Sequence, residues 1–344
     1  MKIFVTGHLG FIGPSVLRLL KKAGHEVTAL DTGYFRDNFD AGEDFVAPDR
    51  EIVKDIRDIS AEDMRGHDAV VHMAGLSNDP LGRLNEELTY DINLHASNKT
   101  ADLAKAEGVS RFVFFSSCSL YGVADTSRPV DETAAQAPVT AYAKSKVGTE
   151  IHLREIADES FSPVFLRNAT CYGISARPRF DLVLNSLCAY GFYQGEIRIL
   201  SDGSPWRPMV HIDDVAQAVL CAVEADRAAV HAEAFNVGIN SENFQIKDLA
   251  QIVKSQLPDA RLAVTGETGG DDRSYRVDFT KARDRLPGFQ PKWSVQKGTT
   301  QILDWCRRRQ DAAFEKVNGR DFIRLKQIEH LHEQQQIDAC LRWA

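Results

Sequence analysis

The sequence predicts an α/β protein, a doubly wound parallel sheet with a smaller lobe of mixed α/β structure. Two features of the 344 residues lead to this prediction. Short apolar runs alternate with stretches of helical periodicity from the N-terminus, a pattern typical of parallel strands joined by helices. After about residue 170 the alternation fades and loops become common, which indicates a second lobe.

The elements of the sheet are expected in a regular order. The first strand spans Lys2–Thr6, and after a glycine-rich turn a helix is expected over residues 12–23, with Gly24 at its C-terminal end. The second strand covers residues 26–30. Further strands are expected at residues 52–54, 69–73, 112–115 and 164–166, and helices at residues 86–107, 215–223 and 243–256.

Three regions of the chain differ in pattern. Residues 1–170 are expected to form the sheet domain, with a segment that returns to it near residues 208–240. Residues 171–207 and 241–305 would form the smaller lobe, and residues 306–344 a helical C-terminal tail. We expect the tail to dock on the body or on a second subunit, because it carries an apolar stripe that would promote aggregation if exposed: Phe322, Ile323, Leu325, Ile328 and Leu331.

The composition excludes several classes of protein. Apolar residues make up 43% and charged residues 26%, which is typical of a globular protein and not of a disordered chain or a fibre. The net charge of −8 offers no broad basic face for a nucleic acid. No apolar run reaches the roughly 18 residues of a membrane span. Six scattered cysteines without a CxxC pair argue against a zinc site or a redox pair. Together with an N-terminus that runs straight into a strand, they predict a cytoplasmic protein.

A glycine-rich motif, Gly7-His8-Leu9-Gly10-Phe11-Ile12-Gly13, joins the first strand to the first helix. Glycine allows a tight turn and a close approach of the backbone to a ligand, and a helix N-terminus attracts an anion through its free N–H groups and its dipole. In this context the motif predicts binding of a dinucleotide pyrophosphate at Gly7, Gly10, Phe11, Ile12 and Gly13. A tight turn without a ligand is the alternative interpretation.

Two acidic residues follow strands in the same half of the chain. Asp31 ends the second strand, 24 residues after Gly7. A carboxylate there accepts hydrogen bonds from the ribose hydroxyls of NAD and repels the additional phosphate of NADP, although a residue of an ordinary surface turn is the alternative. Asp55 and Ile56 follow another strand and are predicted to meet the adenine edge.

A second motif, Tyr142-Ala-Lys-Ser-Lys146, lies near the start of a predicted helix. Tyr142 and Lys146 are four residues apart and therefore share a helix face. An ammonium beside a phenol favours the phenolate. A tyrosine titrates near 10 in water and needs about 4 kcal/mol of such stabilisation to act as a base near neutral pH. The motif therefore predicts a tyrosine base, with an ordinary surface helix as the alternative.

Together these motifs resemble those of the extended short-chain dehydrogenase/reductases, in particular the nucleotide-sugar epimerases and dehydratases. The resemblance covers about residues 1–305, and the order and spacing of these segments carry it: GxxGFIG, Asp31, His72-Met-Ala-Gly75, Ser116-Ser-Cys-Ser-Leu-Tyr-Gly122 and YAKSK. It implies a Rossmann domain that binds NAD, with Met73, Ala74 and Gly75 next to the cofactor. It also implies three catalytic roles: Tyr142 as proton acceptor and donor, Lys146 as ribose anchor and phenolate stabiliser, and Ser117 as the residue that orients the reacting hydroxyl.

The chain departs from two branches of that family directly after Ser117. Sugar 4,6-dehydratases carry an Asp-Glu pair where this chain has Cys118 and Ser119, and the decarboxylases carry Glu at position 119. Neither residue replaces a carboxylate, so oxidation and reduction at one sugar carbon is expected, without elimination or decarboxylation. Cys118 and Ser119 are predicted to border the substrate. A thiol can exchange a proton, but a small buried residue is the favoured interpretation of Cys118.

The resemblance extends into the smaller lobe. Thr170 stands where the family usually has an asparagine that contacts the sugar or the diphosphate. Asn185 and Arg207 match positions that hold the diphosphate, and Arg273 lies where a further diphosphate arginine is often found. A basic loop in the same region either borders the sugar pocket or lies in solvent: Arg177 and Arg179.

These residues lead to one main hypothesis and two alternatives. The main hypothesis is NAD-dependent 4-epimerisation of a nucleoside-diphosphate sugar through a 4-keto intermediate. The first alternative is a one-way, NAD(P)-dependent 4-dehydrogenase or ketoreductase. The second is a non-catalytic NAD-binding sensor, which would have no need of Ser117, Tyr142 and Lys146 together. No nucleic-acid or membrane partner is expected, and the resemblance implies a homodimer formed through the helix that carries Tyr142 and its neighbour.

Overall fold

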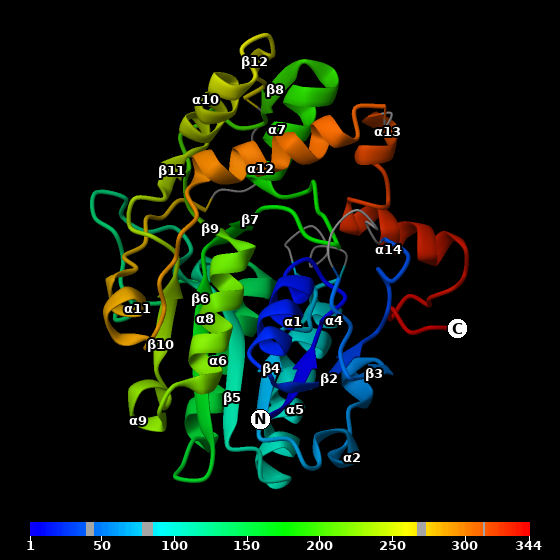
Figure 1. Cartoon of the computed structure of the whole chain (residues 1–344), viewed down its shortest axis with the longest axis vertical. Helices are drawn as coiled ribbons and strands as arrows, with labels where there is room; N and C mark the ends of the chain where they lie inside the picture. The colour runs from blue at the N-terminus through cyan, green and yellow to red at the C-terminus, as the bar shows by residue number, and fades with distance from the viewer. Residues whose placement is uncertain (39–44, 78–84, 267–272, 312–313) are drawn as a thin grey trace.

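A seven-stranded parallel sheet forms the larger part of the protein in a computed structural model that describes residues 1–38, 45–77, 85–266, 273–311 and 314–344 (Figure 1). The strand order is β10-β6-β5-β4-β1-β2-β3, and all neighbouring pairs are parallel. Because the chain starts in the middle, moves out to β3 and returns to β4 on the other side of β1, the sheet is doubly wound. The strands are β1 Lys2–Thr6, β2 Glu26–Asp31, β3 Arg50–Val53, β4 Ala69–His72, β5 Arg111–Ser117, β6 Ser162–Asn168 and β10 Ala234–Val237.

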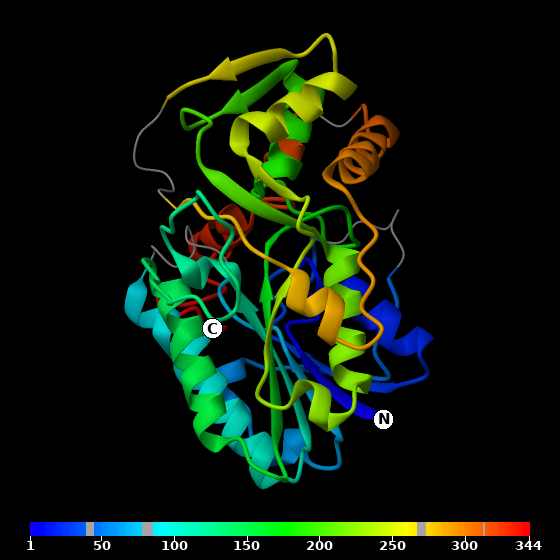
Figure 2. The ribbon, with the colours of Figure 1, turned by 90° about the vertical axis from the view of Figure 1, so that its left-hand side faces the viewer.

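Helices cover both faces of this sheet (Figures 1 and 2). Successive side chains of a strand point to opposite faces, so in β1 Ile3 and Val5 pack in one core cluster and Phe4 in the other. Burial on both faces explains why inner strands such as β1 carry continuous apolar runs, whereas the edge strand β3 is largely exposed. The first cluster includes α1 Gly13–Lys22 and α8 Ile212–Glu224, and the second α4 Glu86–Tyr90, α5 Ala96–Ala106 and α6 Ala141–Ile156.

The smaller lobe lies beyond the sheet and has its own core, which includes Tyr172, Leu249 and Trp305. Two short sheets, with the strand orders β11-β9-β7 and β12-β8, pack there against helices. Between β9 and β11 the chain returns to the large sheet through α8 and β10. The elements of the lobe are β7 Thr170–Tyr172, α7 Val183–Gln194, β8 Glu196–Ile199, β9 Trp206–His211, β11 Asn243–Gln245, α10 Ile246–Gln256, β12 Arg261–Val264 and α12 Val295–Arg308.

Short helical segments complete the described part of the chain: η1 Ile56–Asp58, α2 Ala61–Met64, η2 Asp91–His95, η3 Cys118–Tyr121, α9 Arg227–Val230, α11 Thr280–Arg285, α13 Phe314–Val317 and α14 Arg324–Glu333. In its described part, the C-terminal tail contains the last residues of α12 and the helices α13 and α14, and after Glu333 it consists of turns and one isolated bridge. The tail docks on its own chain, since Ile328 and Leu331 are buried in the second core cluster of the large sheet.

Two of the expected helices differ in detail from the structure. Residues 86–107 contain α4 and α5 with the π-helical turn η2 between them. The helix expected over residues 243–256 begins at Ile246, because Asn243–Gln245 pairs with β9 as the antiparallel strand β11. Gln245 and Asp248 then form a capping box at the start of α10. None of the helices in the described ranges has the length and hydropathy to cross a membrane.

Candidate active site

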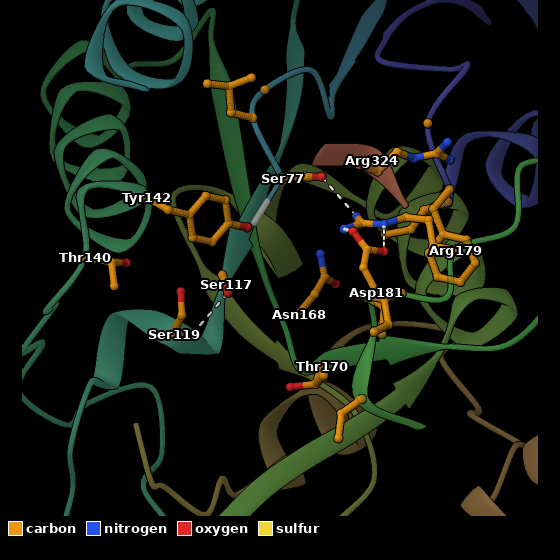
Figure 3. Close-up of a pocket in the computed structure, with 18 of the residues that line it drawn as sticks. Ser77, Ser117, Ser119, Thr140, Tyr142, Asn168, Thr170, Arg179, Asp181 and Arg324 are labelled. Atoms are coloured by element: carbon orange, nitrogen blue, oxygen red, sulfur yellow. Dashed lines mark hydrogen bonds and ion pairs between the residues drawn. The ribbon is translucent and has the colours of Figure 1, made fainter. Parts of the chain in front are cut away.

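One large cavity lies at the carboxyl ends of β1, β2, β4, β5 and β6, between the large sheet and the smaller lobe (Figure 3). Its volume is about 1540 Å³. Parallel α/β sheets bind ligands at this edge, where the strand order reverses. Of the predicted site residues, all except Cys118 and Asn185 line it: Gly7, Gly10, Phe11, Ile12, Gly13, Asp31, Asp55, Ile56, Met73, Ala74, Gly75, Ser117, Ser119, Tyr142, Lys146, Thr170, Arg207 and Arg273.

The glycine-rich turn packs tightly against the segment that follows β4. Gly7 has a φ of +81°, and a Cβ added to it would lie 2.8 Å from the backbone nitrogen of Ala74. A Cβ on Gly13 would overlap with the carbonyl oxygen of His8. These contacts require glycine at both positions, and they place the N-terminus of α1 at the wall of the cavity.

Two carboxylates lie on the same side of the cavity. Asp31, at the end of β2, accepts hydrogen bonds from the backbone N–H groups of Leu9 (3.0 Å) and Gly33 (2.9 Å). The turn and the carboxylate therefore hold each other in place. Asp55 forms an ion pair with Arg57 at 2.6 Å. Burial alone would raise the pKa of Asp55, but the hydrogen bonds from Arg57 outweigh burial and hold that pKa below its usual range.

Tyr142 and Lys146 project from the first two turns of α6. The side chain of Thr140 caps this helix by accepting a hydrogen bond from the N–H of Ala143 at 3.2 Å. The Lys146 ammonium lies 5.6 Å from the centre of the Tyr142 ring and 4.8 Å from the centre of the Phe114 ring. Lys146 is only 5% exposed, and burial lowers the pKa of its ammonium to about 8. Figure 3 shows the Tyr142 ring pointing from α6 into the cavity.

Polar side chains from β5 and β6 lie opposite Tyr142 in the same view (Figure 3). Ser117 accepts a hydrogen bond from the N–H of Ser119 at 3.1 Å. The hydroxyl of Ser119 and the amide oxygen of Asn168 are buried and have no hydrogen-bond partner among the described residues. Asn168 pairs in register with Ser117 at the ends of their strands, so the two side chains reach the cavity together.

Two predicted substrate contacts, Cys118 and Asn185, lie outside the cavity, and for Cys118 this agrees with the interpretation favoured from the sequence, a small buried residue. Cys118 is fully buried, donates a hydrogen bond from its Sγ to the carbonyl of Arg167, and has a pKa raised well above the usual value by burial. Asn185 is also fully buried. Its side chain is bonded to the backbone of Gly173 and Arg179, so it holds the loop after β7 instead of facing a ligand. In both cases backbone groups satisfy the hydrogen bonding of the buried side chain.

Arginines from the smaller lobe line the rest of the cavity. Arg207 donates hydrogen bonds to the carbonyls of Trp206 and Arg273, which fixes its guanidinium at the wall. Arg179 is buried rather than exposed, forms a two-pronged ion pair with Asp181, and donates to the hydroxyl of Ser77 at 3.0 Å. Burial raises the pKa of Asp181, but the charge of Arg179 outweighs burial and lowers it.

Among the polar residues of the cavity wall that sequence reasoning missed are Asn168, Asp181 and Arg324. Asn168 could have been found as the strand-end neighbour of Ser117, had the pairing register been known. Arg324 gave no local signal, because it reaches the cavity from the C-terminal tail.

Comparison with known proteins identifies the family. A model of the NAD dependent epimerase/dehydratase family matches residues 3–238, more than half of the chain. The chain belongs to this family. Members of the family depend on NAD, and the cavity fits that cofactor. The N-terminus of α1 suits a diphosphate, the carboxylate of Asp31 suits a ribose, and the glycines leave the wall of the turn free of side chains.

Individual members of the epimerase/dehydratase family are similar to this chain at modest identity. A UDP-glucose 4-epimerase from Corynebacterium glutamicum is 27% identical over 312 residues, which cover 85% of this chain and 91% of the relative. A dTDP-glucose 4,6-dehydratase from Actinoplanes sp. is 26% identical over 323 residues, with 89% and 98% covered. Among solved structures, a UDP-glucose 4-epimerase from Thermotoga maritima with UDP-glucose is 26% identical. It has a TM-score of 0.78 and covers 90% of this chain and 100% of its own. Two different reactions occur at similar identity, so the reaction must be argued from the site.

Proposed function

We propose that the protein is a 4-epimerase that inverts one ring carbon of a nucleoside-diphosphate sugar through a 4-keto intermediate. When bound, NAD supplies hydride acceptance and hydride return at that carbon. The position of Tyr142 carries the proposal, because its phenol points into the cavity that also holds the glycine-rich turn and Arg207. A sugar hydroxyl bound in this cavity would lie next to the phenol of Tyr142, which can accept a proton and return it.

In this proposal three side chains have separate roles in the transfer of the proton. Tyr142 takes the proton from the sugar hydroxyl and later returns it. Lys146 stabilises the phenolate, since its ammonium lies on the same helix face and in a buried site where charges interact strongly. Ser117 orients the hydroxyl: because its Oγ accepts the N–H of Ser119, its own O–H is available to donate.

The carboxylates of the cavity favour redox chemistry over elimination of water. Elimination needs a further acid and base beside the tyrosine. Four carboxylates occur among the described residues of the wall, and all are already engaged: Asp31 with backbone N–H groups, Asp55 and Asp181 with arginines, and Asp202 with Ser204. This arrangement supports the epimerase reaction rather than that of the 4,6-dehydratases.

For substrate binding, we propose that Arg207 and Arg273 hold the diphosphate and that Ser119 and Thr170 border the sugar. Epimerisation also requires that the keto sugar turns over between the two half-reactions. The volume of about 1540 Å³ exceeds that of a usual small-ligand pocket, roughly 300–1,000 Å³, and leaves space for a cofactor together with a sugar that turns.

For cofactor binding, we propose that the turn residues hold the diphosphate of NAD, Asp31 the adenosine ribose, and Lys146 the nicotinamide ribose. The remaining residues predicted to contact NAD also line the cavity. We propose that Asp55 and Ile56 contact the adenine and that Met73, Ala74 and Gly75 lie beside the phosphates and ribose.

The decisive experiment is incubation of the purified protein with a panel of UDP-, dTDP-, GDP- and CDP-sugars, followed by NMR of the products. We expect one sugar nucleotide to be converted into its 4-epimer with no net change in the absorbance of reduced nicotinamide. Stoichiometric formation or consumption of reduced nicotinamide would instead establish the one-way oxidoreductase. Recovery of every sugar unchanged, in protein shown to hold NAD, would refute an enzymatic role on these substrates.

We further propose a homodimer formed through α6 and the neighbouring α5. The two helices contact each other on one face of the sheet, and Ile151 of α6 is 52% exposed, as expected of a residue covered by a second subunit. Light scattering coupled to size exclusion should give twice the mass of one chain, and Ile151→Asp should shift the protein towards the monomer. A wild-type protein that elutes as a monomer at micromolar concentration contradicts this assembly.

A further inference from the structure

The C-terminal tail lies over the segment that follows β2. The side chain of Gln327 donates a hydrogen bond to the carbonyl of Tyr34 at 3.0 Å, and Trp343 donates from its indole N–H to the carbonyl of Thr32 at 2.7 Å. The hydroxyl of Tyr34 in turn donates to the carbonyl of Leu341. Because Thr32 and Tyr34 lie one and three residues after Asp31, these bonds attach the tail to the half of the cavity assigned to the cofactor.

The first residue of α14, Arg324, forms part of the wall of this half (Figure 3). It is 2% exposed, and its guanidinium carbon lies 4.3 Å from the centre of the Phe35 ring. One terminal nitrogen, Nη2, donates to the carbonyl of Arg177 at 3.1 Å. The other, Nη1, is buried and has no hydrogen-bond partner within the described part of the chain. Such a donor is costly to bury unless a ligand completes its hydrogen bonding.

The charges around Arg324 also indicate an anion. Burial, together with the nearby cations Arg179 and Arg177, lowers the pKa of Arg324 to about 9, although the carboxylates of Asp181 and Asp31 act in the opposite direction. Arg179 is neutralised by its ion pair with Asp181, which leaves Arg324 without an ion-pair partner of its own among the described residues. The N-terminal end of α14 adds a positive dipole at the same place. A buried cation in this setting is stabilised by a bound anion.

We propose that Arg324 binds the diphosphate of the dinucleotide, so that the C-terminal tail completes the cofactor site. This inference rests on the NAD dependence of the proposed function and adds a residue outside the region matched by the family model. A diphosphate occurs in both the cofactor and the substrate, and the neighbours of Arg324 favour the cofactor. Phe35 and the tail contacts at Tyr34 follow Asp31, whereas the arginines proposed for the substrate, Arg207 and Arg273, belong to the smaller lobe.

The first test compares how tightly NAD is held by the wild type, Arg324→Met and Lys326→Met. Lys326 is the matched control, because it lies on the same helix but is exposed. The loss of a charge-assisted hydrogen bond predicts that Arg324→Met binds NAD about 10- to 100-fold more weakly and loses it on dialysis. Lys326→Met should retain wild-type NAD content. Equal NAD affinity in all three proteins would overturn the proposal.

The second test identifies which diphosphate Arg324 binds. NAD-free wild type and Arg324→Met are titrated with ADP-ribose, adenosine and UDP by calorimetry. We expect Arg324→Met to weaken the binding of ADP-ribose but not of adenosine, which carries no phosphate, nor of UDP. Weakened UDP binding with unchanged ADP-ribose binding would assign Arg324 to the substrate and refute the inference.

Folding is checked by thermal unfolding of the NAD-free proteins. Arg324→Met should unfold at the wild-type temperature or above it, because it removes a buried cation without a counter-charge, while the increase in Tm on adding NAD shrinks. If the methionine variant does not fold, Arg324→Gln replaces it in the same measurements, because glutamine keeps a donor for the carbonyl of Arg177. None of these measurements requires turnover, so a failure of the epimerase proposal leaves them interpretable.

Discussion

Tyr142 is the residue on which the chemistry depends. A phenol that exchanges a proton near neutral pH needs a positive charge close by, and Lys146 is the cation on the same face of α6. Burial of Lys146 makes the interaction strong but also makes the ammonium easier to deprotonate. The two effects oppose each other, so the site should work over a limited range of pH.

Replacing Tyr142 by Phe removes the phenol oxygen and keeps the ring. We expect kcat to fall by about 100- to 10,000-fold, the usual contribution of a positioned acid–base group. The NAD content should stay at the wild-type level, because the ring and the helix remain. Product formation by NMR and NAD released on denaturation provide the two measurements. A variant with full activity would show that another group moves the proton.

The pH dependence should report the lowered pKa of Lys146. The ammonium is charged below about pH 8 and neutral above it. We therefore expect kcat/KM to fall as the pH rises through about 8, by up to about tenfold per pH unit. In Lys146→Arg the charge persists and the decline should move to higher pH.

The control for this prediction is Lys144→Arg, which lies on the same helix but is exposed. It should keep the wild-type profile. A wild-type profile that stays level well beyond pH 9 would argue against a role for the Lys146 charge.

At the scale of elements, α6 is fixed to the sheet by a buried ion pair. The carboxylate of Glu150 accepts from Arg167 at 2.6 and 2.9 Å and from the hydroxyl of Ser116 at 2.6 Å. Glu150 lies on α6 after Tyr142 and Lys146, whereas Ser116 and Arg167 belong to β5 and β6. The pair therefore holds the helix that carries the tyrosine against the strands that carry Ser117 and Asn168.

Glu150→Gln should be strongly destabilising. It leaves Arg167 buried without its counter-charge, which typically costs about 3–5 kcal/mol in the free energy of unfolding. Urea unfolding followed by circular dichroism measures this loss. Glu155→Gln, exposed on the same helix, serves as the control and should stay within about 0.5 kcal/mol of wild type. Equal stability of the two variants would mean that the pair contributes nothing net.

Several elements predicted from periodicity agree closely with the structure. The helix expected over residues 12–23 is α1 Gly13–Lys22, and Gly24 follows it with a φ of +85°. The strands expected at residues 26–30 and 112–115 lie within β2 and β5. The start of α10 was missed, because a three-residue strand is set by its partner β9 and not by its own sequence.

At the scale of the whole molecule, His72 connects the two halves of the sheet core. Its ring lies between the hydroxyls of Thr6 in β1 (2.9 Å) and Ser97 in α5 (2.8 Å). Burial, assisted by the charge of Lys146, lowers the pKa of His72 to about 3. Between pH 6.5 and 3 the unfolded chain therefore binds a proton that the folded protein does not.

We expect this histidine to contribute to acid unfolding. Its contribution is fully present above about pH 6.5 and is lost as the pH falls towards 3, by up to about 1.4 kcal/mol per pH unit. His72→Gln should flatten the pH dependence of the free energy of unfolding over that window, whatever its stability at pH 7. His332→Gln, on the exposed side of α14, should leave the slope unchanged. An identical slope in His72→Gln and wild type would contradict this assignment.

The sequence by itself determined the doubly wound sheet, the glycine-rich turn and the pairing of Tyr142 with Lys146. The turn and the pairing follow from spacing within a few residues, and the sheet follows from the alternation of apolar runs with helical stretches along the chain. The tertiary structure alone decided which polar side chains face the cavity. It placed the side chain of Asn185 away from the cavity and those of Asn168 and Arg324 at its wall. The direction and burial of a side chain depend on segments far away in the chain, such as the tail that brings Arg324 against Phe35. The spacing of neighbouring residues does not predict such contacts.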